Sequence, residues 1–137
     1  MYRSIPIIIA VVATLNSTVA SHAQTDSYPA ACKSEMKVPT PGHSSEMMSG
    51  MTKDHQKAAM AGMMKMESNM LQGMMKDDAD VAFVCGMIAH HQGAIDMANA
   101  ELQHGDNAWA KEMAQKVIDA QTKEIAEMTS WLKDNAK

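Results

Sequence analysis

The fold is decided by residues 83–98, which read FVCGMIAHHQGAIDMA. Through and around this stretch, apolar positions recur at alternating steps of three and four, as they do on one face of an α-helix. These positions are Val81, Val84, Ile88, His91, Ile95, Ala98 and Leu102. The pattern predicts a long amphipathic helix from about Ala79 to His104, with the imidazole of His91 on its buried side.

Side chains with soft donor atoms share an arc of the same helix. At about 100° per residue, this arc holds Met87, His90, His91, Ala94, Met97 and Glu101. Thioether sulfur and imidazole in a water-poor place are typical ligands of copper. The plainer alternative is a core histidine beside methionines that fill gaps, which is the commoner role of each residue type.

Two more helices are expected on either side of the central one. Asp77 or Asp78 is a suitable N-cap for the central helix, and Gly105 is expected to end it in the left-handed conformation. Asp106 or Asn107 can cap the third helix. Its seam comprises Ala114, Ile118, Gln121, Ile125, Met128 and Leu132. Short connections make neighbouring helices antiparallel, so the sequence predicts an all-α, up-and-down antiparallel helical bundle without strands.

The first helix is expected from Ser44 to Met75, and it carries methionine where other helices carry branched aliphatic residues. The bundle then has three long helices, or four if this one breaks near Gly50 or Gly62. Its thioethers cover about half of the circumference, more than the roughly 100° stripe that a core face needs. Packing alone therefore explains only the inner ones, and the remaining sulfurs are free for another task.

Methionine spacings of three and four place two sulfurs on one helix face, within reach of a single ion. Neutral, soft thioethers favour Cu(I), with Ag(I) as a mimic, over harder cations. The candidate ligands in the first helix are His55, Met60, Met63, Met64, Met66, Met70 and Met74. A helix so poor in branched residues is expected to gain order when ions bridge its sulfurs.

The N-terminal residues predict export. Residues 1–23 have a basic residue, an apolar run and small residues at the end, as a secretory signal peptide does, with cleavage near Ala23. Residues 24–43 form a Pro-containing extended leader, and residues 44–137 form the Met-rich helical domain. The mature chain is expected in the periplasm or outside the cell, with no membrane span. The formal net charge of −4 argues against a nucleic-acid partner.

Two cysteines, Cys32 and Cys85, remain in what should be an oxidising compartment. On the helical wheel Cys85 lies off the buried arc, where it could tie down the leader. The sequence favours a disulfide between the two residues, and metal ligation by one or both thiols is the alternative, because spacing alone does not fix connectivity.

Two segments resemble the bacterial family catalogued as domain of unknown function 305. They are residues 87–98, MIAHHQGAIDMA, and residues 121–132, QTKEIAEMTSWL. Members of that family are ferritin-like helical bundles that are usually exported and often Met-rich, and some are implicated in periplasmic copper binding and resistance. The resemblance implies that Met87, His90, His91, Met97 and Met128 belong to the shared motif. Ala89 stands where many relatives carry Pro, so their helix kink is not implied here.

The function expected from these features is that of a periplasmic protein that sequesters or passes on Cu(I) in copper tolerance, without turnover. Its partners would be copper ions and a periplasmic copper exporter or chaperone. In this interpretation Gln121 hydrogen-bonds to His90 or His91 and is not itself a ligand. The alternatives are a structural bundle and a ferritin-like di-metal oxidase. The oxidase would use the motif Glu101-x-x-His104, together with Glu67 and Glu124.

Overall fold

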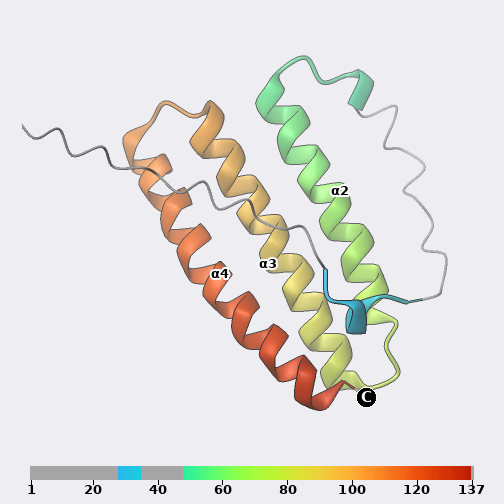
Figure 1. The fold of residues 1–137 in the computed structure, drawn as a ribbon. Coiled ribbons are helices and arrows are strands. Elements are labelled where there is room, and N and C mark those ends of the chain that lie inside the picture. The colour runs from blue at the N-terminus through green and yellow to red at the C-terminus, as the bar shows by residue number, and fades with distance from the viewer. Residues whose placement is uncertain (1–27, 35–47, 137) are drawn as a thin grey trace, which may run out of the picture.

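The computed structural model describes residues 28–34 and 48–136, and within these ranges every regular element is helical. The elements are η1 (Ala30–Cys32), α2 (Asp54–Met74), α3 (Ala79–His104) and α4 (Ala108–Asn135). In the view of Figure 1 the three long helices run down, up and down in chain order, so neighbouring helices are antiparallel. The predicted all-α, up-and-down helical bundle is therefore confirmed, in its form with three long helices.

Several predicted segments lie outside the described residues. They are the signal peptide (1–23), most of the leader (24–43, of which 28–34 is described) and the beginning of the predicted Met-rich domain (44–47). Among the described helices, none combines the length and the apolar character that crossing a membrane requires.

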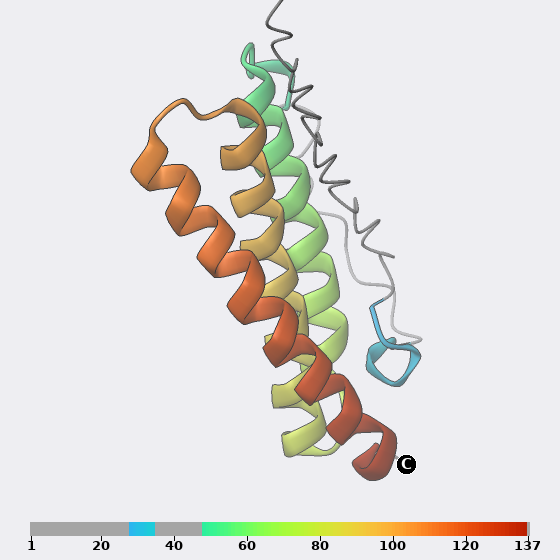
Figure 2. The same ribbon diagram turned by 60° about the vertical axis from the view of Figure 1, so that its left-hand side comes forward.

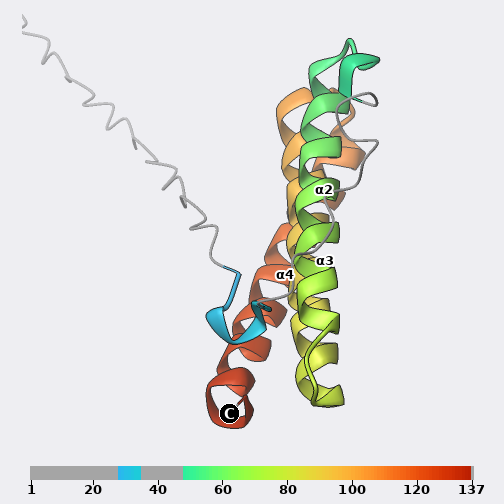
Figure 3. The ribbon, with the colours of Figure 1, turned by 90° about the vertical axis from the view of Figure 1, so that its right-hand side faces the viewer.

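Helix α3 occupies the centre of the bundle. α2 packs along one flank of α3 and α4 packs on another, and α4 crosses α3 obliquely (Figures 2 and 3). The residues of α3 reflect this position, because its small and apolar side chains are buried on more than one side. Ile95 is fully buried at mid-helix and Ile88 is almost so. The predicted bounds of this helix, Ala79 to His104, agree with the structure.

Side-chain caps fix where α3 and α4 begin. The Asp78 carboxylate accepts hydrogen bonds from the backbone N–H groups of Asp80 and Val81 at 2.9 and 3.0 Å. The Asn107 side chain accepts one from Ala110 at 3.1 Å. These bonds satisfy N–H groups that have no partner within the helix. The sequence had offered each cap as one of two neighbouring residues, and the structure selects between them.

The prediction of a left-handed cap at Gly105 was wrong. This residue has φ −75° and ψ 158°, an extended conformation. The last turn of α3 is still closed, because the Gly105 N–H donates to the carbonyl oxygen of Glu101 at 2.8 Å. An extended residue carries the chain straight across the short connection to Asn107, so no reversal through the left-handed region is needed.

Helix α2 is shorter than the continuous helix predicted from Ser44. A turn at Gly50 interrupts the helical path, and α2 begins only at Asp54. At this start the Gln56 side chain accepts a hydrogen bond from the Lys53 N–H at 3.3 Å. Of the two expected breaks, the one near Gly50 occurs. Gly62 instead lies inside α2, buried against α3.

Glycines bring the backbones of α2 and α3 close together. A methyl group on Gly93 of α3 would lie 2.8 Å from Cβ of Met66. A methyl group on Gly62 of α2 would lie 2.8 Å from Cβ of Asp96. Real Cβ atoms do not approach their neighbours so closely, so both positions require glycine at this helix separation. The two contacts also fix the antiparallel register of α2 on α3.

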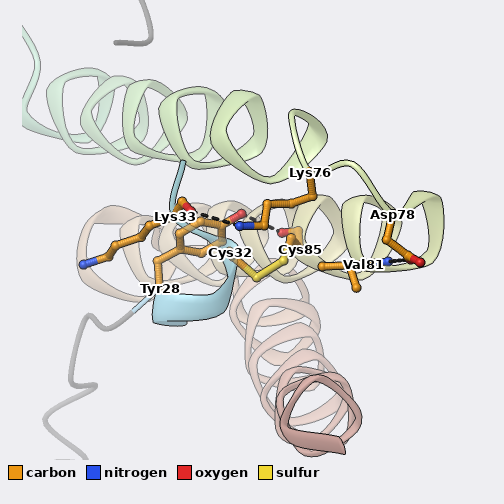
Figure 4. Close-up of a disulfide and its surroundings, with 7 residues drawn as sticks. All are labelled: Tyr28, Cys32, Lys33, Lys76, Asp78, Val81 and Cys85. Atoms are coloured by element: carbon orange, nitrogen blue, oxygen red, sulfur yellow. Dashed lines mark hydrogen bonds between the residues drawn. A yellow bond between two sulfur atoms is a disulfide. The ribbon is translucent and has the colours of Figure 1, made fainter. Parts of the chain in front are cut away.

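A short N-terminal strap, residues 28–34, covers the side of α3 that carries Cys85. Cys32 and Cys85 form a disulfide with a Cα–Cα distance of 5.3 Å, and both side chains are fully buried (Figure 4). The predicted disulfide is thus present in the structure. Closing a loop between residues 53 positions apart stabilises the fold by about 4 kcal/mol on the loop-entropy estimate.

Hydrogen bonds add to this attachment. The Tyr28 hydroxyl donates to the carbonyl oxygen of Cys85 at 3.0 Å, and Lys76 Nζ donates to the carbonyl oxygen of Lys33 at 3.1 Å. Burial raises the pKa of Tyr28 to about 12, so the hydroxyl remains a hydrogen-bond donor even at alkaline pH. The expectation that Cys85 lies off the buried arc of its helix was wrong, because the residue is fully buried in a core cluster with Val81, Ile88 and Leu132. The strap joins this cluster through Cys32.

Two glycines of α3 provide a matched test of the helix separation. Alanine normally stabilises a helix interior relative to glycine by up to about 1 kcal/mol. At Gly86 the new methyl would sit 3.8 Å from Met74 Cγ, an ordinary contact, whereas at Gly93 it would overlap Met66. We expect Gly86→Ala to unfold at the same or higher urea concentration, and Gly93→Ala to lose about 1–3 kcal/mol. Equal stability of the two variants would contradict the close packing.

Candidate metal centre

His91 points towards α4 and is held there by a carboxylate. Its Nε2 lies 2.6 Å from Oε2 of Glu124, and the residue is only 8% exposed. The prediction that Gln121 provides a hydrogen bond to this histidine was therefore wrong. Glu124 lies one turn beyond Gln121 on the same face of α4, a spacing that could have identified it as the partner.

Two buried polar atoms on this flank have no partner within the described part of the chain. They are Nδ1 of His91 and Oε1 of Gln121. Buried groups of this kind are normally satisfied by protein or by water. The α3–α4 interface thus contains a polar island inside an otherwise apolar seam.

His90 behaves differently from its neighbour. Its side chain is exposed, and the two imidazole rings are 6.0 Å apart between centroids at an interplanar angle of 64°. Successive residues of a helix are turned by about 100°, so the His90 ring faces solvent while the His91 ring faces the interior. The double-histidine motif therefore does not bring two imidazoles to one point in this conformation.

Three of the predicted methionine ligands meet in one groove between α2 and α3. Met70 and Met74 come from α2 and Met87 comes from α3. The groove has a volume of about 350 Å³, and its other lining residues are Ala82, Phe83 and Gly86. We call this the thioether groove. Gly86 leaves room on the α3 side, and Met74 and Phe83 stand at its rim, 60% and 66% exposed.

The thioether groove lies on the side of α3 away from the strap. Met87 follows Cys85 by two residues, which is about 200° around a helix. The disulfide therefore occupies one side of α3 while the sulfur-lined groove opens on the other. The cysteines play no part in the groove, since both are in the disulfide.

A second groove lies at the opposite end of the same helix pair. His55 and Ala59 of α2 line it together with Met97, Glu101 and His104 of α3, around a volume of about 340 Å³. We call this the histidine groove. It contains two of the predicted ligands, His55 and Met97, and two residues of the Glu-x-x-His motif.

The remaining predicted ligands are dispersed. Met66 packs on Gly93, and Met128 packs against the core cluster that contains Cys32 and Cys85. The partly buried Met60 and Met64 and the exposed Met63 lie along α2 and line neither groove. In residues 28–34 and 48–136, no three His, Cys, Asp or Glu side chains form a ready group for a metal ion. Thioethers are outside that set of donors.

The contact between His91 and Glu124 predicts a specific loss of stability. Glu124→Ala leaves the buried Nε2 atom without its partner, and we expect the free energy of unfolding to fall by about 1–2 kcal/mol. Glu127 is the matched control, because its exposed carboxylate only pairs with Lys123 at 3.9 Å. Glu127→Ala should change stability by less than about 0.5 kcal/mol in the same urea titration. Equal losses in the two variants would mean that the buried contact contributes nothing of its own.

Comparison with known protein families and proteins gives one match. Residues 11–132 match the family described as Domain of unknown function (DUF305), which extends the resemblance well beyond the two motifs. No curated protein matches the chain. Since the match spans most of the sequence, the chain belongs to the DUF305 family.

Proposed function

We propose that this protein binds Cu(I) in the thioether groove, and that it sequesters the ion or passes it on in the periplasm as part of copper tolerance. The observation that carries the proposal is the convergence of Met70, Met74 and Met87 from two helices on one groove. Methionines that served only to fill the core would have no reason to gather around an open space.

The chemistry of the groove suits a soft monovalent ion. Thioethers are neutral and carry no proton to displace, and they prefer Cu(I) to Zn(II) or other harder cations. The lining beside the sulfurs is apolar, so few oxygen ligands compete. Met70 and Met74 lie one turn apart on α2 and form a pair, which the sulfur of Met87 complements from α3.

An imidazole is available beside the groove. His90 follows Met87 by one turn of α3 and its ring is exposed, so it can approach a bound ion as a further ligand. His91 acts in this proposal as a packing residue, because its Nε2 is already bonded to Glu124. In this proposal His90 is a metal ligand and His91 has a structural role.

Export fits this choice of ligands. A signal peptide and a disulfide are features of proteins in oxidising compartments. Both cysteines are joined in the disulfide, so no thiolate is left to bind the metal. Methionine then supplies the soft donors, and thioethers form no disulfides.

The di-metal oxidase has less support in the geometry. Such a site needs carboxylates gathered in the bundle interior. Glu101 lines the histidine groove, whereas Glu124 is bonded to His91 on the α4 flank. The copper-binding function is therefore the one that we put forward.

A triple substitution in the thioether groove tests the proposal. Met→Leu at 70, 74 and 87 nearly conserves volume and should cost less than about 1.5 kcal/mol at each site. We expect Cu(I) affinity to fall by about tenfold or more, equivalent to 1.4 kcal/mol of binding free energy. The measurement is competition with a Cu(I) chelator, without oxygen and with a reductant that spares the disulfide.

Met→Leu at 60, 64 and 113 is the matched control, because none of these residues lines the groove. This variant should bind Cu(I) as the unmodified protein does. If the two triple variants bind equally well, or lose affinity equally, the thioether groove is not the Cu(I) site.

A further inference from the structure

The histidine groove is lined by both residues of the Glu101-x-x-His104 motif, which has no part in the proposed Cu(I) site. Its polar side chains come from both helices of the pair: His55 from α2, and Glu101 and His104 from α3. We propose that this groove is a second metal site, specific for a divalent cation of borderline softness such as Cu(II) or Zn(II). Its ligands are the two imidazoles and the carboxylate, with the thioether of Met97 at the edge.

The register of the helices explains why these residues meet. Gly93 of α3 faces Met66 of α2, and Asp96 faces Gly62. Following the antiparallel pair towards the start of α2 places His55 opposite His104, the last residue of α3. Glu101 precedes His104 by one turn, so both project from the same face of α3.

The donor atoms select a different ion from that of the thioether groove. Imidazole and carboxylate suit Cu(II) and Zn(II), and Cu(II) binds such ligands most tightly among the divalent first-row metals. His55 and Met70 are 15 residues apart on α2, which separates the two grooves by about 22 Å. Each groove can therefore be disabled without altering the other.

The ends of two helices meet at this groove, and their partial charges are opposite. The last carbonyl groups of a helix carry a partial negative charge, and the groove includes the final turn of α3. The start of α2, with His55 in its first turn, carries a partial positive charge, and the Asp54 carboxylate is paired with Lys57 Nζ at 3.8 Å. Preference for a divalent cation at this groove therefore rests on the donor atoms.

The ligands need only side-chain rotation to assemble. His55 and His104 are exposed at the groove, so their rings can turn freely. The Glu101 carboxylate lies against Gly105, close to where a Cβ would stand, and it must swing out to reach the ion. In the described ranges no three His, Cys, Asp or Glu side chains form a group that could hold a metal ion, so the proposed site requires these side chains to move.

Binding of Cu(II) alone to the full mature chain tests this second site. Electron paramagnetic resonance should show coordination by both imidazoles in the unmodified protein. In His104→Ala and His55→Ala one imidazole should be lost, and affinity by calorimetry should fall by about tenfold or more. Glu101→Gln keeps both imidazoles and should weaken binding to a similar degree. Gln103→Ala changes an exposed residue of α3 that does not line the groove, and should leave the signal and the affinity unchanged.

Retained Cu(I) binding by His104→Ala shows that the variant is folded and that the two sites are independent. Full Cu(II) affinity and an unchanged nitrogen signal in both His104→Ala and His55→Ala would overturn the second site. So would a loss in Gln103→Ala as large as theirs. Failure of the thioether groove is detected separately, by the methionine variants and Cu(I).

Discussion

The close approach of α2 to α3 is the contact on which the rest of the arrangement depends. It exists because Gly62 and Gly93 lack side chains at the points where the helices touch. Leu, Ile, Val and Phe make up about 11% of residues 24–137, below the roughly 20% at which a chain is suspected of disorder. Methionine therefore supplies much of the apolar surface, and the same packing that joins the helices brings Met70 and Met74 beside Met87.

The sides of α3 differ in what covers them. The side towards α4 combines an apolar seam with the bond between His91 and Glu124, and the side under the strap is closed by the disulfide. The remaining side is open, and both grooves lie along it at the α2 border. His90 and His91 are neighbours in sequence, yet the turn of the helix assigns one to solvent and the other to the core.

The sequence predicted the features that depend on local pattern and missed those that depend on how helices meet. Periodicity and capping residues located α3, and two cysteines in a chain that was expected to be exported favoured the disulfide. The conformation of Gly105 was predicted wrongly as left-handed, because the next helix starts so soon after this residue. The partner of His91, and the division of the methionines between grooves and core, depend on the inter-helix register. Glycine contacts set that register, and a helical wheel of a single helix does not contain it.

The central claim is that Cu(I) joins α2 to α3 through thioethers, and amide hydrogen exchange tests it most directly. Before metal is added, exchange should be slow in the middle of α3 and faster in α2. Ordering a backbone costs about 1–2 kcal/mol per residue, and α2 has few branched apolar side chains whose burial would offset this cost. Cu(I) should slow exchange around Met70 and Met74, and around Met87. Zn(II) should have much less effect there, and the variant with Leu at these three positions should not respond. Full protection of α2 without metal, unchanged by Cu(I), would contradict the claim and leave the methionines as ordinary packing residues.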